Sequence, residues 1–151
     1  MDIIKATVED APSISRLIVS VARFFTLQPN GVGAEDFLQT ISPDAEAGYL
    51  ADPRFAYFRA VDNGTLAGVV AVRDSSHLYH LFVDESFQRR GLSRQLWDHA
   101  RAAVGEANPG YFTVNSTPYA QPVYERFGFV ATGPRVETKG IAFVPMRWVA
   151  A

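Results

Sequence analysis

The chain has 151 residues, a usual length for one domain, and its composition of 48% hydrophobic and 20% charged residues is typical of a folded globular protein. With 14 Lys and Arg residues against 16 Asp and Glu residues, the net charge of -2 favours neither nucleic acid nor an anionic membrane as a partner. The sequence has no cysteine, which excludes disulfides, thiolate metal sites and a cysteine nucleophile. Without a recognisable signal peptide or membrane span, residues 1–151 are expected to form a single cytoplasmic domain that needs no metal.

The first part of the chain is predicted to contain one strand and three helices. Residues 3–7 are expected to form the strand, and Pro12, after two acidic residues, favours a helix start. The apolar residues of this helix recur at spacings of three and four, as a face packed on a sheet requires: Ile14, Leu17, Ile18, Val21 and Phe25. A loop over residues 26–33 should precede helices over residues 34–41 and 43–50.

Three strands in a meander are expected next. β-Branched and aromatic residues indicate strands over residues 55–61 and 66–73, and Asn63-Gly64 between them is a strong hairpin signal. Residues 77–83 form a further apolar run that follows a polar turn. Neighbouring strands joined by such short turns should pair antiparallel.

The last part is predicted to alternate helices and strands. Helices are expected over residues 91–104 and 119–127, with strands over residues 111–115, from Phe129 onward, and over residues 140–149. This order of elements indicates an α/β fold, with a mostly antiparallel mixed sheet of about six to seven strands flanked by helices.

A turn between a strand and a helix is the first candidate binding site. The segment Gln88-Arg89-Arg90-Gly91-Leu92-Ser93 follows the strand that ends at Val83 and opens the helix over residues 91–104. Backbone N–H groups converge at a helix N-terminus, and arginines beside it add local positive charge, so the segment could bind a phosphate group. A solvated turn is the alternative.

This turn resembles the coenzyme A signature of the GNAT acetyltransferase superfamily, which reads Gln or Arg, two variable residues, Gly, one variable residue, then Gly or Ala. Ser93 stands at the last position, where it replaces one small residue with another. A second block, from Asn115 to Phe129, is similar to the family's strand-to-helix segment that ends in Tyr-x-x-x-Gly-Phe. A generic nucleotide binder is disfavoured because the chain lacks the Walker and dinucleotide glycine patterns.

The resemblance implies that the sheet splays in the middle, between the strands that end near Val83 and Asn115, to hold acetyl-CoA. The pantetheine arm would run along the first strand, and the pyrophosphate would lie on residues 89–94. Asn115 would either bind the pantetheine or backbone carbonyls, or cap the following helix. The residues implied in cofactor binding are Leu81, Phe82, Val83, Gln88, Arg89, Arg90, Gly91, Leu92, Ser93, Arg94, Asn115 and Tyr124.

Acyl transfer from a thioester to an amine needs a base for the amine and an acid for the departing thiolate. Tyr124 occupies the position where many similar proteins carry the acid, and the alternative is an aromatic residue packed between helix and sheet. His77 stands where several similar acetyltransferases have a base, and the alternatives are a hydrogen-bonded structural histidine and a water chain in its place. Backbone N–H groups at a strand bulge near Phe82 and Val83 would stabilise the oxyanion.

Period-two alternation predicts which side chains of the strand over residues 77–83 face the same way. One face would carry His77, Tyr79 and Leu81, and the other would carry Leu78, His80 and Phe82. His80, on the face opposite His77, is expected to be structural.

The resemblance implies an N-acetyltransferase that uses acetyl-CoA. Direct attack of a primary amine is expected because the chain has no cysteine and neither Ser86 nor Ser93 has an evident base partner. The acceptor could be a small molecule or a peptide, and the protein could form a homodimer. The acidic residues before the meander are expected to form a solvated helix face: Glu35, Asp36, Asp44 and Glu46. The alternative function is an acyl-CoA-binding sensor without turnover.

Overall fold

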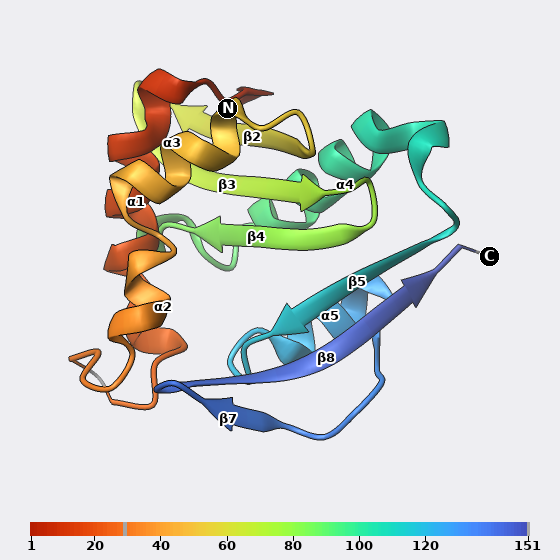
Figure 1. The fold of residues 1–151 in the computed structure, drawn as a ribbon. Helices are drawn as coiled ribbons and strands as arrows, with labels where there is room; N and C mark the ends of the chain where they lie inside the picture. The colour runs from red at the N-terminus through yellow and green to blue at the C-terminus, as the bar shows by residue number, and fades with distance from the viewer. Residues whose placement is uncertain (29, 151) are drawn as a thin grey trace.

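Residues 1–28 and 30–150 are described by a computed structural model, which confirms the expected α/β fold (Figure 1). A mixed sheet of eight strands has the order β1-β2-β3-β4-β5-β8-β6, and β7 pairs with β8. The strands are β1 Asp2–Lys5, β2 Phe55–Asp62, β3 Thr65–Arg73, β4 His77–Val83, β5 Tyr111–Ser116, β6 Val130–Ala131, β7 Val136–Thr138 and β8 Ile141–Val149. The sheet has more strands than expected because Gly133-Pro134 interrupts the segment after Phe129 and leaves two short strands, β6 and β7.

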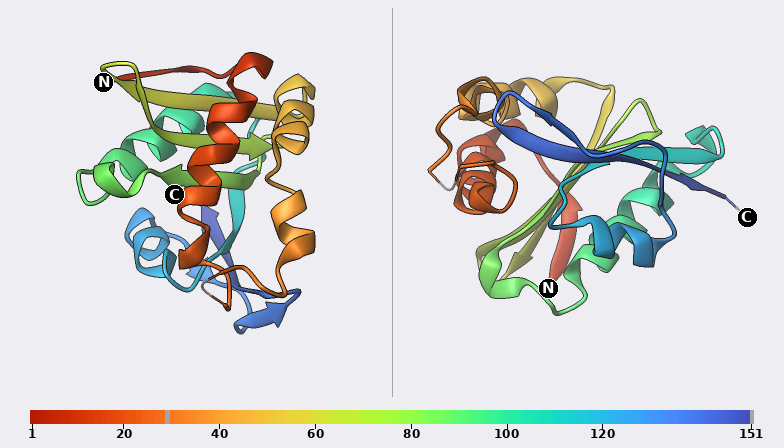
Figure 2. Two further views of the ribbon diagram at one scale, coloured as in Figure 1. Left: turned by 90° about the vertical axis from the view of Figure 1, so that its left-hand side faces the viewer. Right: turned by 90° about the horizontal axis from the view of Figure 1, so that it is seen from below.

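Helices cover both faces of the sheet (Figures 1 and 2). They are α1 Ala11–Ser20, α2 Glu35–Gln39, α3 Pro43–Ala51, α4 Leu92–Val104 and α5 Gln121–Phe127. α1 and α3 pack on one face of the sheet, and α4 packs on the other, where α5 also lies. None of the helices described is long and apolar enough to cross a membrane.

Local sequence signals account for several element boundaries. Pro43 opens α3, and the hydroxyl of Ser42 accepts a hydrogen bond from the N–H of Ala45 as an N-cap. The predicted hairpin joins β2 to β3, and both Asn63 and Gly64 have positive φ angles, as a tight hairpin turn requires.

The core has two apolar clusters, one on each face of the sheet. The cluster under α4 and α5 contains Trp97, Phe112 and Phe129, all fully buried. The other, under α1, contains Ile14 and Ile18, which the helical periodicity predicted. Each buried side chain of this size contributes about 1.5–3 kcal/mol through its removal from water.

A bulge in β4 changes the expected alternation of its side chains. Leu78 pairs with Val72 and His80 pairs with Ala71, so Tyr79 is an extra residue in the ladder. Leu78 therefore packs in the cluster under α4, whereas His80 bonds to α3 on the opposite face. The prediction that Leu78, His80 and Phe82 share one face is wrong for Leu78. The extra residue at Tyr79 shifts the alternation of side chains, so that residues before and after it with even spacing point to opposite faces.

The bulge also lies earlier in β4 than expected. Phe82 pairs with Val69 and Val83 pairs with Gly68 in regular register, so the bulge predicted near Phe82 and Val83 is located instead at Tyr79.

The sheet opens between β4 and β5. These strands are parallel and pair only at His77 with Thr113 and at Leu78 with Val114, after which they diverge (Figure 1). β5 pairs along its whole length with β8 on its other edge. The predicted splay in the middle of the sheet is confirmed, and it leaves a wedge between the C-terminal parts of β4 and β5.

Candidate active site

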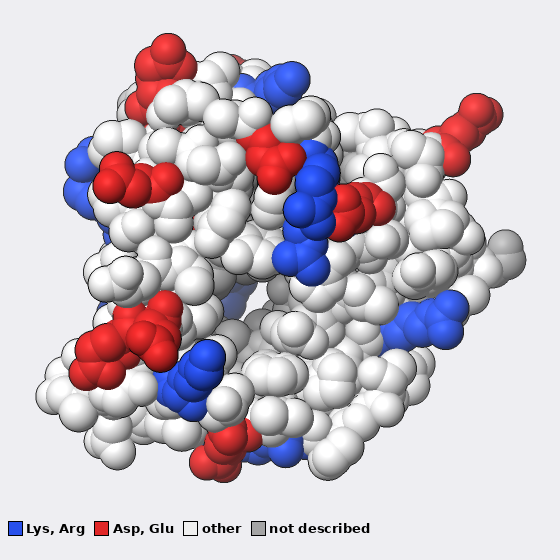
Figure 3. Space-filling view, in the orientation of Figure 1, with Lys and Arg blue, Asp and Glu red and all other residues white. Residues whose placement is uncertain are grey.

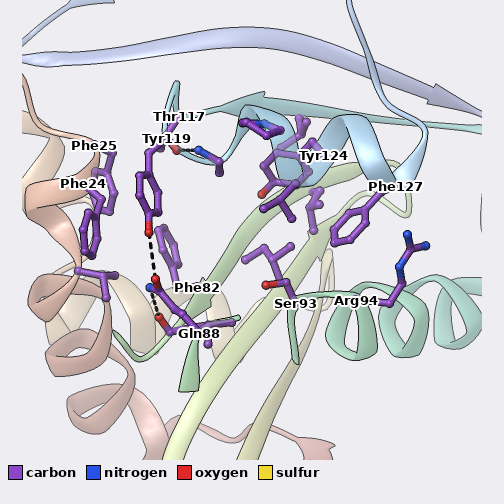
Figure 4. A pocket seen from close by; sticks show the side chains of 18 of the residues that line it. Phe24, Phe25, Phe82, Gln88, Ser93, Arg94, Thr117, Tyr119, Tyr124 and Phe127 are labelled. Carbon is purple, nitrogen blue, oxygen red and sulfur yellow. Dashed lines mark hydrogen bonds between the residues drawn. The ribbon is translucent and has the colours of Figure 1, made fainter. Parts of the chain in front are cut away.

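A cavity of about 480 Å³ occupies the wedge between β4 and β5. The surface is hollowed at this place, between the upper and lower parts of the molecule in Figure 3. Side chains from the segment just after α1, from β4, the turn before α4, α4, β5, the β5–α5 loop and α5 face the cavity (Figure 4). The predicted site residues that line it are Leu81, Phe82, Val83, Gln88, Arg89, Gly91, Ser93, Arg94, Asn115 and Tyr124.

The turn over residues 88–94 leaves the backbone N–H groups of residues 89–94 free. Arg89 and Gly91 both adopt left-handed φ angles, 64° and 79°, which fold the backbone into a tight bend before α4. Among the described residues, no oxygen accepts a hydrogen bond from an N–H group of residues 89–94. The turn is therefore a concave set of donors at a helix N-terminus, which is the arrangement that binds an anion.

The arginines of this segment point in different directions. Arg89 lines the cavity and is exposed. Arg94 also lines it, with its guanidinium 4.8 Å from the ring centre of Phe127 and donating to the carbonyl of Arg126. Arg90 is not among the lining residues, and its guanidinium lies over Phe87, 5.6 Å from the ring centre. Leu92 does not line the cavity either, because its side chain is buried in the core.

A pair of side chains that the sequence interpretation did not connect crosses the cavity (Figure 4). Tyr119, in the loop before α5, donates its hydroxyl hydrogen to Oε1 of Gln88 at 3.1 Å. Nε2 of Gln88 donates to the carbonyl of Val83 at 3.0 Å, at the end of β4. The ring of Tyr119 also stacks on Phe24, with ring centres 4.6 Å apart. These contacts link the segment just after α1, the turn and the β5–α5 loop across the wedge.

Tyr124 is buried in α5 and turns its side chain to the same cavity (Figure 4). Burial raises the pKa of its hydroxyl above the ordinary tyrosine value. Within the described ranges its hydroxyl has no hydrogen-bond partner, although packing against Phe127 and Phe129 fixes the ring. A protonated, unpartnered hydroxyl at a cavity wall is ready to donate to a ligand.

Asn115 lies in β5, at the edge of the cavity, and its side chain is exposed. It does not cap the following helix, because α5 begins after Ala120 and the hydroxyl of Thr117 accepts the N–H of that residue. Of the two alternatives for Asn115, the geometry disfavours the helix cap.

His77 begins β4 at the closed end of the wedge and does not line the cavity. Its Nδ1 lies 2.8 Å from the hydroxyl oxygen of Thr113. Burial, together with the positive charge of Arg73, lowers the pKa of His77 below the ordinary histidine value. The imidazole is therefore neutral near pH 7, as a base must be.

His80 belongs to a buried polar group with Glu46 and Tyr57. Oε2 of Glu46 lies 2.9 Å from Nε2 of His80, and the hydroxyl of Tyr57 donates to Oε1 of Glu46 at 2.6 Å. The expected structural role of His80 fits these contacts. The prediction that Glu46 lies on a solvated face is wrong, because its side chain is fully buried and paired, whereas Glu35, Asp36 and Asp44 are exposed.

In the part of the chain that the structure describes, no group of three or more His, Asp or Glu side chains is arranged to hold a metal ion.

Solved structures with the same fold include several N-acetyltransferases. A GCN5-related N-acetyltransferase from Rhodopseudomonas palustris is 17% identical over 98% of this chain and 94% of that chain, with a TM-score of 0.77. The PaiA N-acetyltransferase from Thermoplasma acidophilum, solved with coenzyme A, is 13% identical over 98% of each chain, with a TM-score of 0.76. The ribosomal-protein-S18-alanine N-acetyltransferase from Escherichia coli is 18% identical over 99% of this chain and 94% of that chain, with a TM-score of 0.72.

These identities show a shared fold, and family membership comes from the sequence itself. No curated protein matches the sequence. The family model described as the acetyltransferase (GNAT) domain matches residues 25–150, which include the wedge, the turn before α4 and Tyr124. The chain belongs to the GNAT acetyltransferase family and is an acyltransferase.

Proposed function

We propose that the protein transfers the acetyl group of acetyl-CoA to a primary amine by direct attack of the amine on the thioester. The observation that carries this proposal is that two sets of hydrogen-bond donors without partners among the described residues border the same cavity. One is the turn of free N–H groups over residues 89–94, and the other is the unpartnered hydroxyl of Tyr124. The first suits an anionic phosphate, and the second suits a leaving group that needs a proton.

The residues of the wedge fit acetyl-CoA in its expected orientation. The pyrophosphate would accept hydrogen bonds from the N–H groups of residues 89–94, with the guanidinium groups of Arg89 and Arg94 nearby. The pantetheine would follow the edge of β4 that β5 leaves unpaired, along residues 81–83. Gln88 would then release the carbonyl of Val83, which could accept from an amide of the pantetheine. Asn115 borders the opposite strand.

The transfer needs one proton to leave the amine and one to reach the sulfur. The amine nitrogen forms a bond to the thioester carbon, which becomes a tetrahedral intermediate with a negative oxygen. The carbon–sulfur bond then breaks as Tyr124 gives its hydroxyl proton to the departing sulfur. The phenolate that forms is a stronger base than a thiolate of pKa about 8.5, so Tyr124 takes up the proton that the amine has lost, and one proton in all passes from nitrogen to sulfur.

His77 is proposed as the base, acting through water because it lies outside the cavity wall. Its lowered pKa keeps it able to accept a proton near neutral pH. Direct attack is preferred to an acyl-enzyme because the chain has no cysteine.

Calorimetry with acetyl-CoA, and competition by ATP and NAD, test the binding step. We expect heat with acetyl-CoA and no displacement by the other two nucleotides. Arg89→Ala should weaken acetyl-CoA binding about fivefold, which corresponds to about 1 kcal/mol. Arg90→Ala is the matched control, because the side chain of Arg90 lies over Phe87 and should leave the affinity unchanged. An equal loss in both variants would contradict the proposed place of the pyrophosphate.

Release of CoA from acetyl-CoA in the presence of a broad amine panel tests the transfer step. Amine-dependent release supports the enzyme. Binding of acetyl-CoA without release by any amine would favour the alternative, an acyl-CoA-binding sensor.

A further inference from the structure

The cavity has two ends of different chemistry (Figure 4). Near α4 and α5 it is bordered by Ser93, Arg94 and Tyr124, whereas Gln88, at the start of the turn, lies beside the other end and accepts a hydrogen bond from Tyr119. Near α1 it is bordered by an aromatic end, which consists of Val21, Phe24, Phe25, Phe82 and Tyr119. If acetyl-CoA occupies the first end as proposed, the aromatic end is the part of the cavity left for the acceptor.

The aromatic end is already shaped by packing within the protein. Phe25 is buried, and its ring lies 5.3 Å from Phe37 and 5.6 Å from Phe82, centre to centre. Tyr119 is held by its stack on Phe24 and by its hydrogen bond to Gln88. A wall of fixed rings offers an apolar surface at little cost in side-chain ordering, so it favours a ligand group that is itself apolar and of ring size.

Charge at the cavity disfavours an acceptor with several positive charges. Among the described residues that line the cavity, the charged ones are all arginines: Arg89, Arg94 and Arg126. No described lining residue is Asp or Glu, so a second ammonium group of the acceptor would find no carboxylate there. The nearby Glu85 is already paired with Arg23.

Phe24, one ring of the aromatic end, already has two close partners. One face of Phe24 is covered by the ring of Tyr119, and the guanidinium of Arg23 lies over Phe24, 4.6 Å from the ring centre. Phe24 thus already has a cationic partner, and the guanidinium of Arg23 would repel an ammonium group brought to the same ring.

An apolar end also helps the chemistry of the amine. Burial in apolar surroundings lowers the pKa of an ammonium group, which favours the neutral amine that attacks the thioester. A single amine on an apolar group gains this shift, whereas a polyamine would keep other charges that resist burial.

We propose that the acceptor is a small monoamine whose amino group is carried on an aromatic or similarly bulky apolar group, which binds at the aromatic end. This inference rests on the proposed acetyl transfer. It excludes polyamines and aminoglycosides as preferred acceptors, and it gives Tyr119 a specificity-determining contact.

The test compares kcat/KM for CoA release with five acceptors at saturating acetyl-CoA. They are 2-phenylethylamine, n-butylamine, 1,4-diaminobutane, kanamycin and an alanine-initiated tripeptide. We expect kcat/KM for 2-phenylethylamine to be about tenfold higher than for n-butylamine, which corresponds to about 1.4 kcal/mol from one well-packed ring. Its excess over kcat/KM for 1,4-diaminobutane should be larger. A higher kcat/KM for the diamine, kanamycin or the peptide would overturn the inference.

Variants of Tyr119 locate the contact, because this side chain is exposed and its loss should not threaten folding. Tyr119→Ala should raise KM for 2-phenylethylamine about tenfold and change KM for n-butylamine much less. Tyr119→Phe keeps the ring and should restore the discrimination between these two amines. Val19→Ala, on the exposed side of α1, is the control for general effects. Equal changes of KM for both amines in Tyr119→Ala would contradict the assignment.

The two proposals fail in different ways. If acetyl-CoA gives no heat in calorimetry and no amine releases CoA, the proposed function is wrong. If acetyl-CoA binds and amines release CoA, but diamines or aminoglycosides are preferred, only the inference about the acceptor is wrong.

Discussion

Tyr57 and Tyr124 are both buried, and they lie on opposite faces of the sheet. Burial raises the pKa of both hydroxyls, and beside Tyr57 the carboxylate of Glu46 adds to the effect. Tyr57 donates its hydrogen to Glu46, whereas Tyr124 has no partner among the described residues and faces the cavity. A satisfied buried hydroxyl stabilises the fold, and an unsatisfied one on a cavity wall indicates a place for a ligand. Substitutions on the two sides should therefore affect different measurements.

Glu46→Ala should give the largest effect, on stability. Removal of the carboxylate leaves His80 and the hydroxyl of Tyr57 buried without their partner, which typically costs about 3–5 kcal/mol. Chemical denaturation followed by circular dichroism measures the loss. A loss below 1 kcal/mol, well under the usual cost of about 3–5 kcal/mol, would mean that the group contributes little to folding.

Tyr124→Phe should act on turnover instead. Loss of the proton donor should lower kcat about 100-fold, or about 2.7 kcal/mol in the barrier, with the ring and its packing retained. The free energy of unfolding and the affinity for acetyl-CoA should stay close to those of the wild type. Unchanged turnover would remove Tyr124 from the mechanism and weaken the contrast with Tyr57.

Tyr57→Phe is the matched substitution on the other face. It removes one hydrogen bond to a buried carboxylate and should lower the free energy of unfolding by about 2 kcal/mol. Steady-state kinetics at a temperature where the variant is folded should give a kcat near that of the wild type. A loss of kcat as large as in Tyr124→Phe would show that the two faces are not functionally distinct.

His77→Gln should have the smallest effect. A base must be neutral to act, and the pKa of His77 is lowered below about 6.5, so kcat should rise with pH through a midpoint below that value and then level off. The variant should lose about tenfold in kcat at pH 7, because this proton path acts only through water, and it should lose this acid limb of the profile. If the limb persists in the variant, another group is the base.

Regular patterns in the sequence predicted most of the fold. The spacing of Ile14 and Ile18 predicted the buried face of α1, and Asn63-Gly64 predicted the hairpin, because both signals depend on residues close together in the chain. The run over residues 77–83 predicted β4 with its observed bounds. The turn before α4 was predicted from its own residues and from the family resemblance, and it lies at the wedge as expected.

Features that depend on distant partners could not be predicted in this way. Glu46 has the appearance of a surface residue, and only its contacts with β2 and β4 explain its burial. The bulge at Tyr79 depends on the register with β3, which a single strand does not specify. Tyr119 lies in a block that resembles the family, but its partners Phe24 and Gln88 are far from it in sequence.

The short pairing of β4 with β5 has a mechanical consequence. Only two residue pairs join the halves of the sheet, so widening the wedge breaks few hydrogen bonds of the ladder. A molecule bound along β4 would replace the missing rungs and tie the halves together. Because such a ligand binds only the folded chain, a free ligand concentration of 100 times the dissociation constant should raise the free energy of unfolding by about 2.7 kcal/mol. If the proposed acyl donor binds there, it should make the two halves of the sheet harder to separate.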